Sequence, residues 1–330
     1  MSIKNVIFVL SVDTEEEWDW SGPFPDKDFS VENVNELPAF QNYCQELSIK
    51  PTYMVDYAVS NNPRSASILR ALNKGHCEIG AHLHPWANPP FQSSTDEFSS
   101  HVINLPIKDV EKKLQLLVQS IEKNIGCIPK SFRTGRWGIN GDVLRLLNTY
   151  NFNIDTSIYP LYNNEFFSCE WAPGQSYWPD YANTNNKGTQ RDVLEVPVTV
   201  GFNRVHYKQC QKLHRLFEHP HFSWLRLNGI LWHTKIMRKI YLSPELCSGK
   251  DMVTLIDTCL KKGHTLFHMY LHSSSLLENV TGLSDKANAR EYLCQQMKIA
   301  VEYLKTKANV TFCTMSEARS LLTDNKSESE

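Results

Sequence analysis

The sequence predicts an α/β fold whose parallel sheet closes into a barrel, and three observations support this. Short apolar runs typical of buried strands recur along the 330-residue chain, and segments with helical apolar spacing separate most of them. Strands that alternate with helices form parallel sheets, and a count of seven or eight strands favours closure of the sheet. Polar titratable residues also follow several of these runs, at the edge where α/β barrels keep their functional sites.

Each element is predicted from a local pattern. The run Val6 to Leu10 is continuously apolar, as expected of a first buried strand. Further strands are expected at 52–55, 77–82, 130–132, 153–157, 193–200, 265–271 and 310–312. Segment 107–125 has apolar residues three and four positions apart, which predicts an amphipathic helix, and Gly75 can end a helix over 66–74. Other helices are expected at 31–47, 140–150, 250–262, 286–306 and 315–322.

Two segments interrupt the alternation. Residues 158–192 are rich in Tyr, Trp, Phe and Asn with little periodicity, which indicates a surface excursion beside a site. Residues 204–241 contain eight Lys or Arg, a single Glu, and many apolar and aromatic residues. This composition suits either contact with an anionic membrane face or an inserted helical hairpin packed on the barrel. We therefore expect one domain over 1–323 with these two excursions, and a polar, disordered tail at 324–330.

Composition and charge exclude several classes of protein. The formal net charge is -2 and the sequence pI is about 6.6, so the chain lacks the basic field of a nucleic-acid binder. The nine cysteines never form a CxxC pair, which favours reduced thiols and a cytoplasmic location. The short N-terminal apolar run reads as a strand and not as a signal peptide, and no apolar stretch is long enough to span a bilayer. Segment 204–241 remains a candidate for peripheral contact with the inner membrane face.

Two acidic residues end the first predicted strand. Residues two apart in a strand point to the same side, so the carboxylates of Asp13 and Glu15 would converge on one spot while Thr14 points away. Such a pair suits a general base beside a metal ligand. The alternative interpretation is a solvated acidic turn after a buried strand.

His82 and His84 end the predicted strand at 77–82 and are also two residues apart. Two imidazoles and a carboxylate form a common catalytic metal set that leaves positions open for water. A His-x-His pair alone more often consists of structural or surface histidines. Its position favours a metal site, because Asp13, Glu15, His82 and His84 all fall at the ends of predicted strands.

Three further titratable residues occupy equivalent positions. Arg133 follows the strand at 130–132, Asp155 ends the next strand, and His272 follows the strand at 265–271. Each has a structural alternative, namely a surface ion pair, a turn cap and a loop histidine. Polar groups at five strand ends together favour an active site.

Aromatic and polar residues near these positions suggest a carbohydrate groove. Trp18, Trp86 and Trp137 lie close to the predicted strand ends and could stack against sugar rings, although such residues also form small cores. Arg136 belongs to the loop at 133–138, and Glu195 ends a strand where it could bind a sugar hydroxyl or amine. We count these five as candidate substrate-binding residues.

Taken in order, these residues resemble the polysaccharide deacetylases, also called NodB-homology or carbohydrate esterase family 4 proteins. The resemblance rests on the acidic pair after the first strand, Glu78-Ile79-Gly80-Ala81-His82-Leu83-His84-Pro85, the loop at 133–138 and Leu271-His272. More narrowly, the chain is similar to the WalW-like branch, associated with lipopolysaccharide biosynthesis, through Phe132-Arg133-Thr134-Gly135-Arg136-Trp137-Gly138 and Leu271-His272-Ser273-Ser274-Ser275-Leu276. The resemblance covers residues of about 5–320, apart from the two excursions.

The resemblance implies a distorted (β/α) barrel, often seven-stranded, that hydrolyses N-acetyl groups on sugars with a divalent metal, usually zinc. By motif, Asp13 would be the general base, Arg133 the group that tethers it, and His272 the general acid. A backbone N–H near Trp137 would help to stabilise the oxyanion. We further expect Asp155 to orient His272.

This sequence departs from the family pattern at two places. Most members have adjacent aspartates in the first motif, whereas Thr14 separates Asp13 from Glu15 here, and the second motif usually spaces its histidines four apart, whereas position 86 is Trp. The ligand set is therefore either Glu15, His82 and His84, or the site lacks a metal, as in allantoinase-like relatives.

The expected function is metal-dependent N-deacetylation of a nucleotide- or lipid-linked acetamido sugar in cell-surface polysaccharide or lipopolysaccharide biosynthesis. Two alternatives stay open. One is a metal-free amidase acting on a small amide, which would be indifferent to a chelator. The other is a catalytically inactive carbohydrate-binding barrel, in which Asp13 and His272 would not converge on one pocket.

Overall fold

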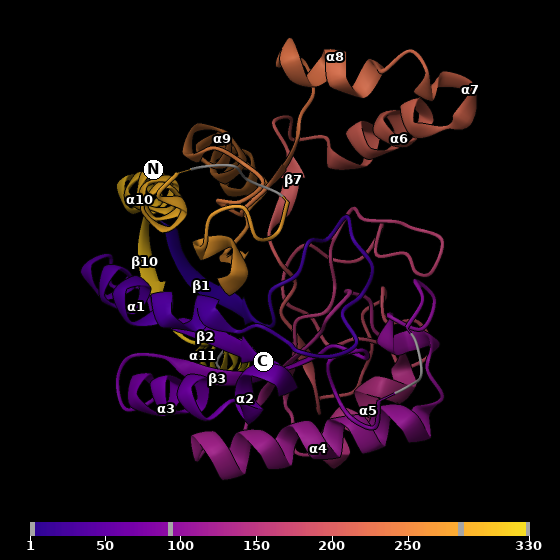
Figure 1. The fold of residues 1–330 in the computed structure, drawn as a ribbon. Helices are drawn as coiled ribbons and strands as arrows, with labels where there is room; N and C mark the ends of the chain where they lie inside the picture. Colours follow the sequence, from indigo (N-terminus) through magenta and orange to yellow (C-terminus); the bar gives the residue numbers. More distant parts are fainter. Residues whose placement is uncertain (1–3, 92–94, 283–286, 328–330) are drawn as a thin grey trace.

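The computed structural model describes residues 4–91, 95–282 and 287–327, and its centre is a parallel sheet wrapped by helices (Figure 1). The long strand β1 (Lys4–Thr14) pairs along one edge with β9 (Leu266–His272). Its other edge is shared by two strands at different heights, β10 (Ala308–Phe312) and β2 (Pro51–Val55). The sheet continues from β2 through β3 (Glu78–Leu83), β4 (Ser131–Thr134), β5 (Ile154–Asp155) and β6 (Leu194–Glu195).

Eight described strands thus occupy seven positions around a curved sheet, and the predicted distorted (β/α) barrel is confirmed. Irregular backbone bridges the gap between β6 and β9. The Thr199 N–H donates to the His268 carbonyl at 3.0 Å, and the His268 N–H donates to Thr199 Oγ1 at 2.8 Å. The Leu242 N–H in turn donates to the Thr199 carbonyl at 2.9 Å.

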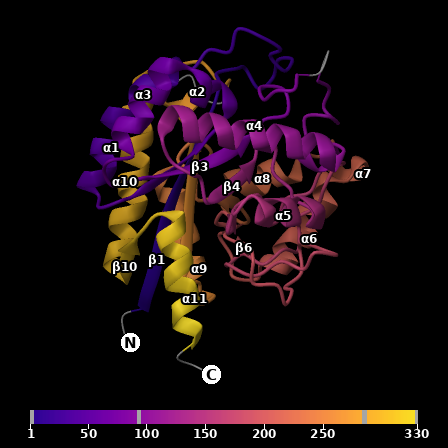
Figure 2. The same cartoon turned by 90° about the horizontal axis from the view of Figure 1, so that it is seen from below.

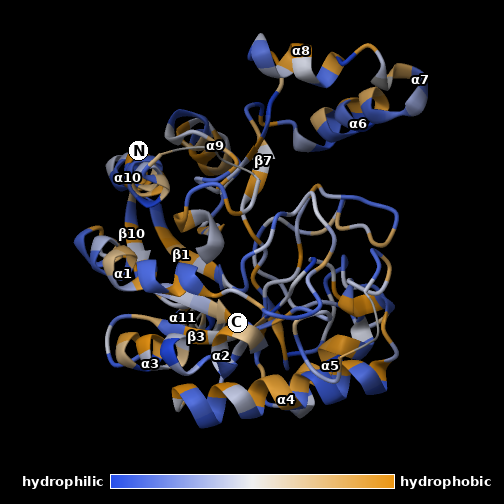
Figure 3. Cartoon of the chain, viewed as in Figure 1, coloured by the Kyte–Doolittle hydropathy of each residue, from blue (hydrophilic) through white to orange (hydrophobic). Residues whose placement is uncertain are grey.

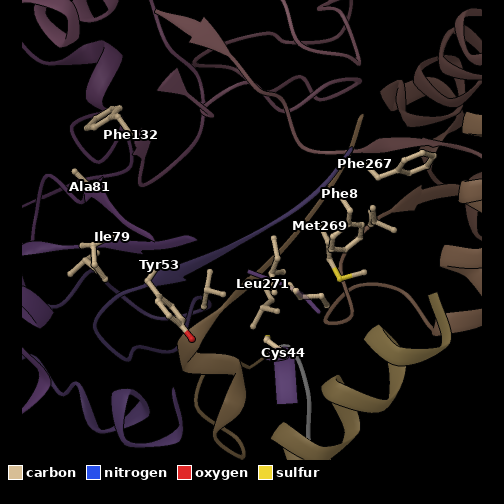
Figure 4. Packing of buried hydrophobic residues seen from close by; sticks show 14 of the residues in the cluster. Phe8, Cys44, Tyr53, Ile79, Ala81, Phe132, Phe267, Met269 and Leu271 are labelled. Atoms are coloured by element: carbon tan, nitrogen blue, oxygen red, sulfur yellow. The ribbon is translucent and has the colours of Figure 1, made fainter. Parts of the chain in front are cut away.

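Alternation along the strands separates the helix-covered face from the barrel interior. Phe8 of β1 packs with Phe267, Met269 and Leu271 of β9 in the main core (Figure 4). The residues between them in sequence therefore point to the other side of the sheet, into the barrel. This alternation delivers Asp13 to the barrel interior.

Several helices of the described chain cover the outer face of the barrel and contribute buried residues to the main core. They are α1 (Leu37–Glu46), α3 (Pro63–Leu72), α4 (Ile107–Ile125), α5 (Gly141–Thr149), α9 (Gly249–Lys261) and α10 (Ala289–Lys307). The apolar spacing of α4 buries Val110, Leu114, Leu117 and Ile121, and the helix ends where Gly126 adopts φ 88°. The bounds predicted for this helix are therefore confirmed.

Some elements differ from expectation. The short helix α2 (Tyr57–Asn61) was not predicted; Asp56 caps it by accepting a hydrogen bond from the Val59 N–H at 2.8 Å. Helix α11 (Met315–Ser327) continues into the segment predicted as a disordered tail, whose last residues, 328–330, lie outside the described part of the chain. Among the described residues, no helix combines the length and apolar character needed to cross a membrane.

The two excursions have different structures. Residues 158–192 contain only isolated bridges among turns, yet they bury Cys169 and Trp178. The second excursion begins with β7 (Val200–Phe202) and returns along the antiparallel β8 (Lys239–Tyr241). Between them lie α6 (Tyr207–Glu218), α7 (Pro220–Ser223) and α8 (Leu227–His233), which project from the barrel in Figure 1 and lie behind α4 and α5 when seen from below in Figure 2. We call residues 204–241 the helical hairpin.

Candidate active site

The carboxyl ends of the parallel strands bring the predicted residues to one edge of the barrel. Asp13 ends β1, His82 lies in β3, Arg133 lies in β4 and His272 ends β9. In the register of the sheet Asp13 is paired with His272, and His82 with Arg133. Residues distant in sequence are therefore adjacent because neighbouring parallel strands end together.

A buried ion pair fixes Asp13. Arg133 Nη1 donates to Asp13 Oδ1 at 2.5 Å, and both side chains are buried. The other carboxylate oxygen, Oδ2, lies 3.6 Å from His272 Nε2. One oxygen of Asp13 is thus held by the guanidinium, while the other faces the imidazole.

Arg133 is itself held on several sides. Its Nε donates to the Thr156 carbonyl at 3.1 Å, and its Nη2 donates to Ser11 Oγ at 2.7 Å. Ser11 Oγ also lies 2.8 Å from His268 Nε2. Burial, followed by the nearby Arg133 charge, lowers the pKa of His268 well below its ordinary value. His268 is consequently neutral and can accept or donate one hydrogen bond without adding a second positive charge.

His272 is oriented by Glu245, a residue that the sequence interpretation missed. Glu245 Oε2 lies 3.0 Å from His272 Nδ1, and Oε1 accepts the His272 backbone N–H at 2.6 Å. Burial alone would lower the pKa of His272, but the negative charges of Glu245 and Glu15 outweigh it and raise that pKa to about 9. His272 is therefore protonated at neutral pH, with Nε2 directed toward Asp13.

Asp155 does not occupy the position expected for the partner of His272, so that interpretation is wrong. Its carboxylate accepts hydrogen bonds from the Ser157 hydroxyl at 2.7 Å and the Ser157 N–H at 3.2 Å. It also faces Glu195, its partner in the strand register. Burial, then the Asp155 charge and a hydrogen bond to Asp155, raises the pKa of Glu195 well above its ordinary value. The two acids form a buried pair that shares a proton below the candidate site, and neither lines the pocket described below.

Glu15, His82 and His84 converge as expected of metal ligands. Glu15 Oε2 lies 3.1 Å from His82 Nε2 and 3.3 Å from His84 Nε2, and all three side chains are buried. Burial would raise the pKa of Glu15, but the charges of His272 and His84 and the hydrogen bonds from the histidines lower it. Two ligands about 2.1 Å from one tetrahedral zinc lie roughly 3.4 Å apart. The two distances from Glu15 are close to this value, and the ligand atoms of all three side chains lie within 4.8 Å of one another, so the set could hold a divalent metal ion.

A second carboxylate supports this set. Glu16 accepts a hydrogen bond from Trp86 Nε1 at 2.5 Å, and both of its oxygens lie 3.0 Å from His84 Nδ1. Its neighbour Asp56 has a pKa raised well above the ordinary value, by burial first and then by the Glu16 charge. A metal-binding histidine commonly has a carboxylate on its other nitrogen. The sequence analysis missed both acids, although Asp56 directly follows β2 and could have been found by its place at a strand end.

Lys113 of α4 fixes the loop that follows β3. Its buried ammonium donates to the carbonyls of Pro85, Asn88 and Pro90 at 2.8, 2.6 and 2.7 Å. Burial lowers the pKa of Lys113 to about 8. The same loop carries Trp86, whose ring stacks on His84 with 4.2 Å between centroids. The Lys113 ammonium therefore fixes the backbone that directly follows His84 and carries Trp86.

Glu15, His84 and His272 open onto an aromatic pocket of about 260 Å³, whereas Asp13 and His82 do not line it. Its lining consists of Glu15, Trp18, Trp20, His84, Trp86, His101, Gly135, Arg136, Trp137, Tyr162, Asn164 and His272. Four of the five residues predicted to bind substrate are among them, and Glu195 is not. Trp20 packs edge-on against His272 with 4.5 Å between centroids, so the imidazole is partly covered by an aromatic ring.

Trp137 forms another wall of the pocket. It adopts φ 59°, in the left-handed region that is unusual for a bulky residue. Its ring lies 4.8 Å from the Arg133 guanidinium carbon and stacks on Tyr159 at 4.7 Å. The backbone N–H of Trp137, the kind of donor expected for an oxyanion, instead points to the Thr134 carbonyl at 3.4 Å. This distance marks a weak hydrogen bond.

Comparisons with known proteins agree with the fold. No protein-family model and no curated protein matches the sequence. Among solved structures, the chain is similar to a candidate polysaccharide deacetylase from Mycobacterium smegmatis, with a TM-score of 0.57 and 13% identity over 98% of this chain and 92% of that one. It is also similar to a 4-α-glucanotransferase from Thermococcus litoralis, with a TM-score of 0.53 and 12% identity over 96% of this chain and 40% of that one. A family 4 acetyl xylan esterase from Clostridium thermocellum, in complex with a cobalt ion, has a TM-score of 0.42 and 13% identity over 96% of this chain and 91% of that one.

The chain therefore has the distorted barrel fold of the polysaccharide-deacetylase type. The narrower resemblance to the WalW-like branch stays a prediction. Because a glucanotransferase shares this architecture, the fold alone does not define the reaction. The reaction has to be argued from the side chains of the site.

Proposed function

We propose that this chain, as one barrel over residues 1–323, catalyses metal-dependent hydrolysis of the N-acetyl group of an acetamido sugar. One observation supports the proposal above all others. The carboxylate of Asp13 and the imidazole of His272 face each other at 3.6 Å, beside Glu15, His82 and His84. A general base, a general acid and a three-ligand metal set side by side are the parts that amide hydrolysis requires.

Glu15, His82 and His84 would hold the metal. Two imidazoles and a carboxylate suit zinc, which when bound polarises the acetyl carbonyl and makes water a better nucleophile near neutral pH. Glu16 keeps His84 Nδ1 occupied, so that Nε2 presents its lone pair toward Glu15 and His82. The remaining steps are proton transfers by the chain's own residues.

Asp13 is suited to accept the proton of the attacking water. Its Oδ1 is held by Arg133, and its Oδ2 is left directed toward His272 Nε2. Water adds to the carbonyl carbon, and the carbon–nitrogen bond then breaks. His272 holds a proton at Nε2 that it can give to the departing amine, so that acetate and the free amino sugar leave.

The pocket walls support a sugar as the substrate. Trp18 and Trp86 present aromatic faces, and Phe24 packs against both, with centroids 5.0 and 4.7 Å away. Sugar rings place their C–H faces against such surfaces. We further propose a nucleotide- or lipid-linked acetamido sugar in cell-surface polysaccharide or lipopolysaccharide assembly, in the cytoplasm. This finer assignment rests on the WalW-like motif around 132–138 and on the cysteine usage of the chain.

Metal content and acetate release, measured on the same samples, test the proposal. Wild type is compared with Asp13→Asn, His82→Ala and His84→Ala, and with His76→Ala, an exposed histidine elsewhere, as the matched control. The substrates are N-acetylated sugar nucleotides. We expect about one equivalent of metal and acetate release in wild type and control.

The variants separate the metal from the base. His82→Ala and His84→Ala should lose both the bound metal and acetate release. Asp13→Asn should keep the metal and lose activity by about 100-fold or more. Acetate release without metal would instead indicate the metal-free amidase. Metal without release from any sugar nucleotide, polymer or small amide would indicate an inactive binding barrel.

A further inference from the structure

The helical hairpin gathers exposed apolar side chains. Of the fifteen large apolar side chains that are exposed in the described part of the chain, eight lie between 205 and 236. Trp224 is 74% exposed and follows α7 directly, and Figure 1 shows α7 projecting away from the barrel. Figure 3 shows apolar and polar residues side by side along this segment. Single exposed apolar residues are ordinary, but a group of them marks an interaction surface.

These side chains are not needed to attach the hairpin to the barrel. Helix α6 buries Tyr207, Cys210 and Gln211, whereas Leu213 and Leu216 are 39% and 49% exposed. Buried and exposed apolar residues therefore occupy different faces of the same helix. The exposed face remains available to a partner.

The same segment is strongly cationic. It contains eight Lys and Arg residues and one Glu, so its formal net charge is +7. The remaining residues carry -9, and the whole chain carries -2. Arg215 and Arg238 form ion pairs with Glu170 and Asp251. No ion pair within the described residues involves the exposed side chains of Lys208, Lys212, Arg226 or Lys235. These four charges are available to an anionic partner.

We propose that the helical hairpin docks the protein on an anionic lipid surface. Exposed Trp, Phe and Leu side chains surrounded by Lys and Arg are the combination that an interfacial membrane contact requires. Anionic headgroups attract the cations, and the apolar side chains enter the headgroup boundary. The negative charge on the rest of the chain repels the same surface, so the hairpin is the part that approaches it.

Charge favours this partner over a second copy of the chain. Two hairpins packed face to face would each bring +7 into one interface, and close like charges oppose association. A lipid surface supplies the opposite charge without requiring a matching shape. A lipid surface can be bound by an exposed face of mixed apolar and cationic side chains, because such binding requires no groove.

The hairpin is joined to the pocket by stacked rings. Tyr241, in β8 at its base, stacks on Tyr159 at 5.7 Å with 4° between planes, and Tyr159 stacks on Trp137 of the pocket wall at 4.7 Å. Docking would therefore hold the pocket in a fixed relation to the membrane. This geometry suits a lipid-linked sugar, a point that rests on the proposed function, whereas the docking itself does not.

Vesicle sedimentation of the full chain tests the docking. The probes are vesicles of phosphatidylcholine alone and vesicles with 30% phosphatidylglycerol. Wild type should sediment with the anionic vesicles only, and added salt should release it. Lys208→Glu with Lys212→Glu reverses two charges one turn apart on α6, and should weaken binding about tenfold or more. Trp224→Ser should weaken it several-fold.

The control reverses two exposed lysines outside the hairpin, with Lys108→Glu and Lys298→Glu, and should leave binding unchanged. Acetate release from a soluble sugar nucleotide should be unaffected by all of these variants, so a failure to dock is distinguishable from a failure of the proposed activity. Equal binding to both vesicle types, or wild-type binding by the hairpin variants, would overturn the proposal. The proposal would also be overturned if the protein bound no vesicles but associated with itself, and if Trp224→Ser abolished that self-association.

Discussion

Glu245→Gln tests the contact that holds His272 in place. The substitution keeps a side chain of nearly the same shape and an oxygen for the His272 N–H, which now lies 2.6 Å from Glu245 Oε1. It removes the negative charge that lies 3.0 Å from His272 Nδ1. Glu245 touches no substrate in the proposed reaction, so it acts as a positioning residue through the imidazole.

The size of the effect follows from the pKa of His272. That pKa is about 9, and the Glu245 charge is the strongest of the interactions that raise it against burial. At pH 8 a group with a pKa of 9 is about 90% protonated, whereas a group at the ordinary 6.5 is about 3% protonated. If general acid catalysis requires the protonated form, the variant should lose about 30-fold at pH 8 and less than about twofold at pH 6.

The assay is a pH profile of kcat for acetate release. Because the folded pKa is raised, activity in wild type should fall as the pH rises through about 9, and in Glu245→Gln the fall should begin two or more pH units lower. Glu122→Gln removes an equal charge from the exposed face of α4 and should leave the profile unchanged. An alkaline limb that does not move, or a loss equal at every pH, would refute the assigned role of Glu245.

Three further predictions concern stability. Arg133→Met leaves the buried Asp13 carboxylate without its partner and should lower the free energy of unfolding by about 3–5 kcal/mol; urea denaturation measures this, and a loss under about 1 kcal/mol would contradict the buried ion pair. Lys113→Met leaves three carbonyls without this donor, two of them buried, and should cost about 3 kcal/mol, together with reduced activity; a variant as stable as wild type would show that water replaces the ammonium. Removing metal with a chelator should lower the Tm of wild type because the ligand stabilises only the folded state, and should not lower the Tm of His82→Ala; equal shifts in both would place the metal elsewhere.

Local patterns predicted the elements that position the site. The continuous apolar run of β1 and the period of α4 are strong signals because each segment buries one face or both. Strand ends then predicted the neighbours in space, since parallel strands finish at the same edge, and the structure places Asp13 beside Arg133 and His272 as that argument requires. Their catalytic roles remain predictions.

The partners of these residues were harder to predict. Glu245 lies in a segment without periodicity, 27 residues before the histidine it orients, so only the fold brings them together. Glu16 adjoins Glu15 in a run of acids, and strand alternation does not predict where its side chain lies, because β1 ends at Thr14. Asp155 was given a role by its place at a strand end, yet its neighbour Glu195 offers it a nearer partner.

The acid pair below the site links folding to proton binding. In the folded chain the pKa of Glu195 is raised well above the ordinary 4.5, whereas the unfolded chain releases this proton near that value. The folded state then binds more protons than the unfolded state, and stability falls as the pH rises from about 4.5 toward the folded pKa. The slope from this one group is about 1.4 kcal/mol per pH unit. The barrel interior therefore contributes a stability that is fully present in mild acid and is lost as the pH rises through the folded pKa of Glu195.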